Sequence, residues 1–283
     1  MTAKTTRLFL SLAIAPLALG LTACKADPAA DAAVEGPKGD AVAAVAPPAG
    51  KAWSDVVDAT PDGGMRMGNP AAPIKVIEYG SLTCPGCAKL AQEGFAPLVT
   101  NYVSSGKVSF EFRSFAIHPQ DVPLTVLVRC APKEAFFPLI EQIYSNFNAM
   151  NAVYGDKPRL AQAEAAMALP PAQRWAAFSQ VVGYTDFFAA RGVAKDQANA
   201  CLSDLSKATL VADQAKKYGE SGITGTPTLF INGTKLGVSD WAGLESGLKA
   251  AGARQAALDG GNRNADADQA AQTDWLQKLC RAC

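Results

Sequence analysis

The chain has 283 residues, 49% of them hydrophobic, and its 26 basic and 26 acidic side chains leave no net charge. This composition is typical of a globular protein, and the length is enough for one elaborated domain or two small ones with a buried core. The balanced charge argues against nucleic acid and acidic molecules as partners.

The first 23 residues predict an export signal. Two basic residues precede the apolar run LFLSLAIAPLALGL, which suits the core of a signal peptide and falls short of the roughly 20 residues of a membrane helix. The sequence LTAC ending at Cys24 resembles the lipobox of bacterial lipoproteins, which implies that Cys24 becomes the lipidated first residue. The alternative is a general export signal followed by an incidental cysteine. Lys25 favours the outer membrane by the same resemblance, so we expect a periplasmic protein with a lipid anchor.

Residues 24–58 predict a disordered tether between this anchor and the folded part. Most of the segment consists of alanine, proline, glycine and aspartate, without a periodic apolar face. Such a segment buries too little apolar surface to offset the entropy lost on ordering it.

The folded part begins with a pattern of strand, thiols, helix and strand. Residues 74–79 (IKVIEY) are rich in β-branched side chains, which predicts a buried strand. Two thiols, Cys84 and Cys87, follow its carboxyl end. Residues 88–103 then predict a helix that Pro97 kinks or ends. Residues 108–112 alternate apolar and polar side chains, which predicts a second strand and completes a βαβ unit.

A block of helices follows, from about residue 121 to 220, because apolar side chains recur there at helical spacing without a strand pattern. Strand character returns at residues 228–236, where Asn232-Gly233 predicts a hairpin turn. A last helix follows, with Ser239 or Asp240 as its N-cap.

The order βαβ, helical block, ββα, together with the motifs CPGC at residues 84–87 and GTPT at 225–228, resembles the DsbA family of thiol:disulfide oxidoreductases. The resemblance covers roughly residues 65–252. It implies an α/β, thioredoxin-like fold with an inserted all-helical domain. The implied parts are a thioredoxin-like domain at 59–120 and 221–252, a helical insertion at 121–220 and a C-terminal extension at 253–283.

The two cysteines of CPGC suit redox chemistry on physical grounds alone. Cys84, at the start of a helix, lies beside unpaired backbone N–H groups and the positive end of the helix dipole, which stabilise its thiolate. Cys87, one turn into the helix, is shielded but close enough to close a disulfide. We therefore expect Cys84 to exchange with substrates and Cys87 to be the resolving sulfur. Gly86 stands where the family's well-known oxidants have a histidine, which predicts a less acidic Cys84 and a milder oxidant.

The resemblance also assigns roles outside the CPGC motif. It implies that Pro227 is a cis-proline facing the active-site sulfurs and that the backbone of Thr226 pairs with an extended substrate segment. The alternative is a trans-proline turn before a strand. Glu78 matches the family's buried acid and is a candidate proton relay for Cys87, whereas the alternative is a strand residue that faces solvent.

Six of the seven cysteines remain once the lipidated one is set aside. Relatives often pair cysteines near the positions of Cys130 and Cys201, which implies a structural disulfide, and two buried free thiols are the alternative. Cys280 and Cys283 form a second CxxC pair outside the family pattern. It is either a redox relay to the CPGC pair or, as we favour, an inert local disulfide.

These features predict a periplasmic oxidoreductase that needs no cofactor or metal and acts as an oxidant. The expected partners are exported proteins with thiols or disulfides and a membrane protein that resets the pair. Within the redox class, the alternative is a reductase or isomerase kept reduced by a membrane partner. The alternative from another class is a zinc-binding structural module using both CxxC pairs, against which their wide separation argues. We expect His118, in a predicted loop, to pack or face solvent rather than to take part in chemistry.

Overall fold

A computed structural model describes residues 37–254 of the chain. The predicted export signal with Cys24 and the second CxxC pair, Cys280 and Cys283, lie outside the described residues. No helix within the described part is long and apolar enough to cross a membrane.

Six strands of the described part form one sheet, in the order β1-β2-β4-β3-β5-β6. Its centre is the predicted parallel pair, in which Val76 lies beside Phe110 and Glu78 beside Phe112, and the other neighbouring strands are antiparallel. The strands are β1 (Val57–Ala59), β2 (Met65–Gly68), β3 (Ile74–Gly80), β4 (Val108–Ser114), β5 (Thr228–Ile231) and β6 (Thr234–Lys235). The sheet therefore confirms the predicted α/β fold.

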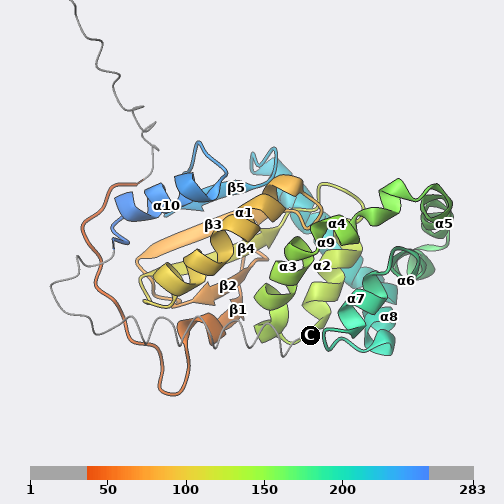
Figure 1. Cartoon of the computed structure of the whole chain (residues 1–283), viewed down its shortest axis with the longest axis horizontal. Helices are drawn as coiled ribbons and strands as arrows, with labels where there is room; N and C mark the ends of the chain where they lie inside the picture. The colour runs from red at the N-terminus through yellow and green to blue at the C-terminus, as the bar shows by residue number, and fades with distance from the viewer. Residues whose placement is uncertain (1–36, 255–283) are drawn as a thin grey trace, which may run out of the picture. The chain divides into compact units, whose positions relative to one another are not determined.

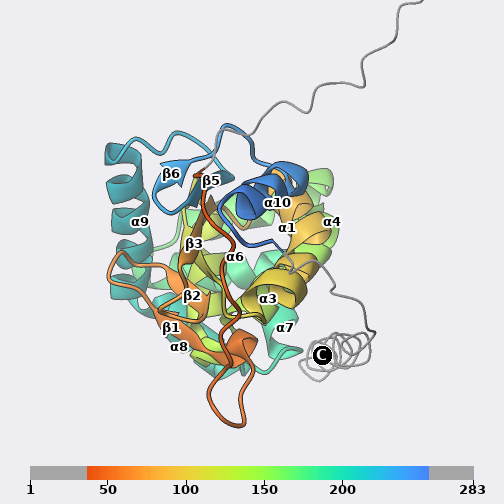
Figure 2. The same cartoon turned by 90° about the vertical axis from the view of Figure 1, so that its left-hand side faces the viewer.

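Helices cover both faces of this sheet, as Figure 2 shows. Helices α1 (Pro85–Pro97) and α10 (Trp241–Ala250) lie on one face and α9 (Leu205–Glu220) on the other. On the first face Phe95 packs against Phe110 with ring centroids 6.2 Å apart, and on the second Tyr79 packs against Tyr218 at 5.0 Å. Alternate residues of each central strand supply the two apolar surfaces.

Helix α1 begins directly after Cys84 and ends at Pro97, as the sequence indicated. The chain continues as a short π-helical segment, η2 (Leu98–Val103), in which the N–H of Ser104 donates to the carbonyl of Val99. Proline has no N–H to donate to the carbonyl four residues before it. The helical ladder therefore changes spacing at this point rather than stopping.

The segment from residue 121 to 220 consists of helices joined by short connections and contains no strand, as the sequence predicted. In Figure 1 helices α5 to α8 lie beyond the end of the sheet. A disulfide between Cys130, the last residue of α2, and Cys201 in α8 joins two parts of the insertion that are 71 residues apart. The helices before α9 are α2 (Asp121–Cys130), α3 (Phe136–Ser145), α4 (Phe147–Met150), α5 (Lys157–Met167), α6 (Pro171–Val182), α7 (Tyr184–Ala189) and α8 (Lys195–Ser203).

The described part of the predicted tether, residues 37–58, is packed against the domain, which corrects that expectation. The backbone N–H groups of Gly39, Val42 and Val45 donate to carbonyls near the ends of α10 and η2. Trp53 is buried, and its indole N–H donates to the carbonyl of Val45 at 2.7 Å. Backbone pairing and one large aromatic side chain thus hold a segment whose composition alone predicted disorder.

The end of the domain follows the prediction. Asn232 and Gly233 adopt positive φ angles of 49° and 81° in the turn between β5 and β6, the conformation that an Asn-Gly hairpin turn requires. Asp240 is the N-cap of α10, and its carboxylate accepts a hydrogen bond from the N–H of Gly243 at 2.8 Å. The domain extends slightly beyond residue 252, since Ala253 is also buried.

Candidate active site

The two thiols of the CPGC motif lie where strand β3 meets helix α1. Cys84 is the N-cap of α1 with an extended backbone, and Pro85 takes the first helical position, where its missing N–H costs nothing. Both cysteines are free thiols; Cys84 is 6% exposed and Cys87 is fully buried. Cys84 is therefore the sulfur nearer to the surface, as the sequence indicated.

The loop before β5 lies directly against Cys84. The peptide bond between Thr226 and Pro227 is cis, and the Cys84 thiol donates a hydrogen bond to the Thr226 carbonyl at 3.3 Å. A Cβ placed on Gly86 would lie 3.2 Å from Cδ of Pro227 and 3.7 Å from the Cys84 sulfur. The small residue thus allows the proline loop to approach the CPGC turn closely.

Hydrogen bonds to the sulfur make Cys84 acidic. The Cys87 thiol is the main influence that lowers the pKa of Cys84 to about 5, and the Thr226 side chain and the N–H groups of Cys87 and Gly86 add to it, while burial opposes them. Thr226 Oγ1 is buried and has no hydrogen-bond partner in the described part of the chain while Cys84 is protonated. It is therefore available as a donor when the sulfur ionises.

Cys87 and Glu78 have raised pKa values, in contrast to Cys84. Burial, followed by the hydrogen bond with Cys84, raises the pKa of Cys87 well above its ordinary value. Glu78 is 7% exposed on β3; burial, followed by the charge of Cys84, raises its pKa to about 8. One of its oxygens has no hydrogen-bond partner in residues 37–254. The site thus pairs an acidic outer sulfur with an inner thiol and a carboxyl that hold their protons at neutral pH.

A buried carboxylate just behind the CPGC motif escaped the sequence analysis. Asp121, the first residue of α2, accepts hydrogen bonds of 2.9 to 3.0 Å from the Ser81 hydroxyl, the Thr83 N–H and hydroxyl, and the N–H groups of Ile117 and His118. It therefore fastens the turn before Cys84 to the loop before the insertion. An acidic residue opening a helix was the available signal, but it is also the ordinary signal of a surface helix start.

The structure brings together five of the predicted site residues: Cys84, Cys87, Thr226, Pro227 and Glu78. The Cys130–Cys201 disulfide lies within the insertion. No cluster of three potential metal ligands occurs in residues 37–254, and the second CxxC pair required by the zinc alternative lies outside them.

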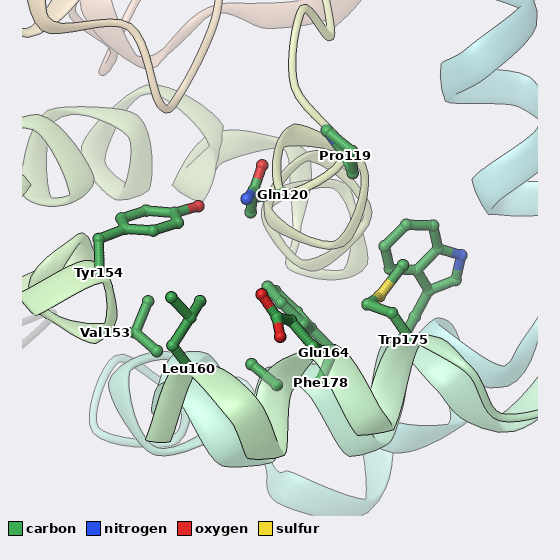
Figure 3. A pocket seen from close by; sticks show the side chains of 10 residues that line it. Pro119, Gln120, Val153, Tyr154, Leu160, Glu164, Trp175 and Phe178 are labelled. Carbon is green, nitrogen blue, oxygen red and sulfur yellow. The ribbon is translucent and has the colours of Figure 1, made fainter. Parts of the chain in front are cut away.

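A pocket of about 490 Å³ opens in the insertion next to the loop that leads into α2. Figure 3 shows Tyr154, Glu164 and Trp175 around it, with Pro119 and Gln120 on the side of the loop. Its lining is mostly apolar and includes one carboxylate and no basic side chain.

Comparisons with known proteins agree with this geometry. A family model described as "Thioredoxin" matches residues 60–250. A protein of Rickettsia prowazekii named "putative protein-disulfide oxidoreductase" is 27% identical over 175 residues, which cover 62% of this chain and 56% of that protein. This chain thus spans little more than half the length of the curated relatives it matches most extensively.

Two solved structures have a related fold. The protein-disulfide isomerase from Novosphingobium aromaticivorans has a TM-score of 0.61 and 28% identity, covering 65% of this chain and 95% of that one. The alpha-DsbA1 protein of Wolbachia pipientis has a TM-score of 0.54 and 21% identity, covering 66% of this chain and 90% of that one.

Proposed function

Since the chain belongs to the thioredoxin family, we propose that it is an oxidoreductase of the DsbA type, which uses Cys84 and Cys87 to introduce disulfides into exported proteins. The observation that carries the proposal is the set of hydrogen-bond donors around the Cys84 sulfur, beside the Thr226-Pro227 loop, which lowers the pKa of Cys84. A thiolate that is stabilised in the reduced protein makes the corresponding disulfide easier to reduce, and therefore a stronger oxidant.

The exchange proceeds through a mixed disulfide. A substrate thiolate attacks Sγ of Cys84, the bond between Cys84 and Cys87 breaks, and Cys87 leaves with the electron pair and takes up a proton. A second substrate thiolate then attacks the substrate sulfur of the mixed disulfide and releases Cys84 as a thiolate. Two electrons pass from the substrate dithiol to the protein, and the substrate gains one disulfide.

The acidity of Cys84 sets how far the redox couple is shifted in the oxidising direction. With a pKa of about 5 instead of the ordinary 9.0, ionisation at pH 7 stabilises the reduced protein by a factor of about 100, or about 3 kcal/mol. For a two-electron couple this corresponds to about 60 mV in the oxidising direction. That the couple is milder than in relatives with a histidine at the position of Gly86 stays a prediction.

Glu78 and Thr226 would assist the exchange. Glu78 holds a proton at neutral pH because its pKa is about 8, so it can protonate Cys87 as that sulfur leaves. The backbone of Thr226, next to the Cys84 sulfur, would pair with the extended substrate segment.

We place this activity in the periplasm, on a chain anchored by lipid at Cys24, with a membrane protein that resets the pair. The support is the lipobox-like sequence and the Cys130–Cys201 disulfide, because structural disulfides are usual in oxidising compartments and rare elsewhere. Incorporation of labelled fatty acid, lost in Cys24→Ser, tests the anchor. Labelling that persists in that variant would contradict it.

An isomerase is the second candidate, because the solved structure of Novosphingobium aromaticivorans is named a protein-disulfide isomerase. The test compares the rates at which the protein rescues a fully reduced and a scrambled substrate protein, with Cys84→Ser as the inactive control. Faster oxidation of the reduced substrate supports the oxidant, and faster rescue of the scrambled one supports the isomerase. Bound zinc without a Cys84–Cys87 disulfide would instead support the zinc module.

A further inference from the structure

The only histidine of the chain, His118, lies against the residue that precedes Cys84. Its Nδ1 is 2.9 Å from the hydroxyl oxygen of Thr83, and its own backbone N–H donates to Asp121 at 3.0 Å. The side chain is exposed, whereas Thr83 and Asp121 are buried. A surface imidazole is thereby connected to the interior of the site through one hydroxyl group.

The surroundings of Asp121 set the direction of this connection. Three backbone N–H groups and two hydroxyls point at its two oxygens. An ionised carboxylate satisfies such a set because it only accepts hydrogen bonds. The Thr83 hydroxyl therefore gives its single proton to Asp121 at 3.0 Å.

The oxygen of Thr83 then turns its lone pairs toward His118, which must donate from Nδ1. The result is a chain of hydrogen bonds from the imidazole Nδ1–H to the Thr83 hydroxyl and from there to Asp121. The Nδ1–H tautomer keeps this bond without charge, and the imidazolium keeps it with a positive charge.

We propose that His118 is a positioning residue for Cys84: through Thr83 it fixes the turn that presents the sulfur, and as an imidazolium it adds a positive charge near the thiolate. The inference rests on the proposed role of Cys84 as the exchanging sulfur. The two residues between the cysteines, Pro85 and Gly86, have no charge to offer. In this chain the nearby imidazole would come from His118, in a loop distant in sequence, rather than from a residue between the two cysteines.

The contacts of His118 bring it close to one acidic group and to the residue before Cys84. Asp121 faces it from the start of α2, and Cys84 follows Thr83 at the start of α1. Tyr154 and Glu164 line the pocket that begins at the next residue, Pro119 (Figure 3).

The experiment measures the rate at which iodoacetamide alkylates Cys84 in the reduced protein between pH 3.5 and 8. Mass spectrometry assigns the modified sulfur, and Cys87 is shielded by burial. The proteins are the wild type, His118→Ala, His118→Asn and Gln120→Ala. Asparagine can donate near the position of Nδ1 without charge, and Gln120 is a matched control in the same loop.

We expect the midpoint of the His118→Ala profile to rise by half to one pH unit, with alkylation three to ten times slower on its acidic limb. This is the effect of removing one nearby charge at a partly shielded site. In His118→Asn the plateau rate, which reports the geometry of the turn, should match the wild type, while the midpoint stays raised. Gln120→Ala should follow the wild type throughout.

A double-mutant cycle tests the route through Thr83. If His118 positions the turn through this hydroxyl, the effects of His118→Ala and Thr83→Val on the plateau rate will not add. Profiles of both His118 variants that coincide with the wild type, or effects that add fully, would overturn the proposal. Should Thr83→Val fail to fold, the two His118 variants still decide. If Cys84 reacts as a thiolate in all of these proteins, the proposed function stands whatever the role of His118. If Cys84 does not react in the wild type, the proposed function is refuted.

Discussion

Replacing Thr226 by valine removes one donor from the Cys84 thiolate and keeps the shape of the side chain. The hydroxyl is buried next to the sulfur, has no other partner in the described residues, and lowers the pKa of Cys84. A hydrogen bond to a charged group contributes about 1.5 to 3 kcal/mol. Three other donors remain, so we take the lower end, which raises the pKa of Cys84 from about 5 to about 6.

The same change appears in the redox equilibrium. At pH 7 a rise of one unit lowers the stabilisation of the reduced form about tenfold, which makes the couple about 30 mV less oxidising. Thiolate absorbance near 240 nm, followed during acid titration, gives the pKa, and equilibration with glutathione gives the potential.

Thr228→Val is the control for this measurement. Its hydroxyl donates to the Gly225 carbonyl at 2.7 Å in the same segment and makes no hydrogen bond to Cys84. We expect both readouts to stay at the wild-type values in this variant. If Thr226→Val also leaves both unchanged, or if the two variants shift them equally, the hydroxyl does not stabilise the thiolate and the reasoning is wrong.

Three further predictions concern stability. Glu78 has a pKa of about 8 because it is buried, so the folded protein loses stability as pH rises from about 4.5 to 8. In urea unfolding, the free energy of unfolding of Glu78→Gln relative to the wild type should therefore increase across that range, by several kcal/mol at most. A difference that does not change with pH would contradict this prediction. Replacing Cys130 and Cys201 by alanine opens a loop of 71 residues and should cost about 4 kcal/mol, which denaturant unfolding without reductant measures; equal stability of the two proteins would show that the bridge does not constrain the unfolded chain. Asp240→Ala removes the cap on the N–H of Gly243 and should cost about 1 kcal/mol by the same assay, with Asp240→Asn as the variant that retains most of it.

The central βαβ unit, the hairpin and the last helix were predictable because each has a strong local pattern. The β-branched run of β3, the alternation of β4, the Asn232-Gly233 turn and the Asp240 cap all act over a few residues. The cysteine pair and the GTPT loop were predictable from their motifs. Their proximity, with the Cys84 sulfur 3.3 Å from the Thr226 carbonyl, depends on the fold as a whole.

Features that depend on backbone pairing or on distant contacts were not predictable. Strands β1 and β2 are short, and residues 37–52 bind the domain largely through backbone N–H groups, which amino-acid composition does not reveal. The sequence reasoning attributed the acidity of Cys84 to the helix start. The structure shows the Cys87 thiol as the main influence, with backbone N–H groups adding to it.

The place of Asp121 limits how far the helical insertion can be treated as a separate module. This residue opens α2, yet its carboxylate holds Ser81 and Thr83, which lead into the cysteine motif. A chimera that exchanges the insertion between relatives at residue 121 would cut through this contact and misplace the reactive sulfur. An exchangeable unit would therefore have to keep residue 121, and Tyr144 of α3 ties a second part of the insertion to the same turn, because its hydroxyl donates to the Ser81 carbonyl at 3.0 Å.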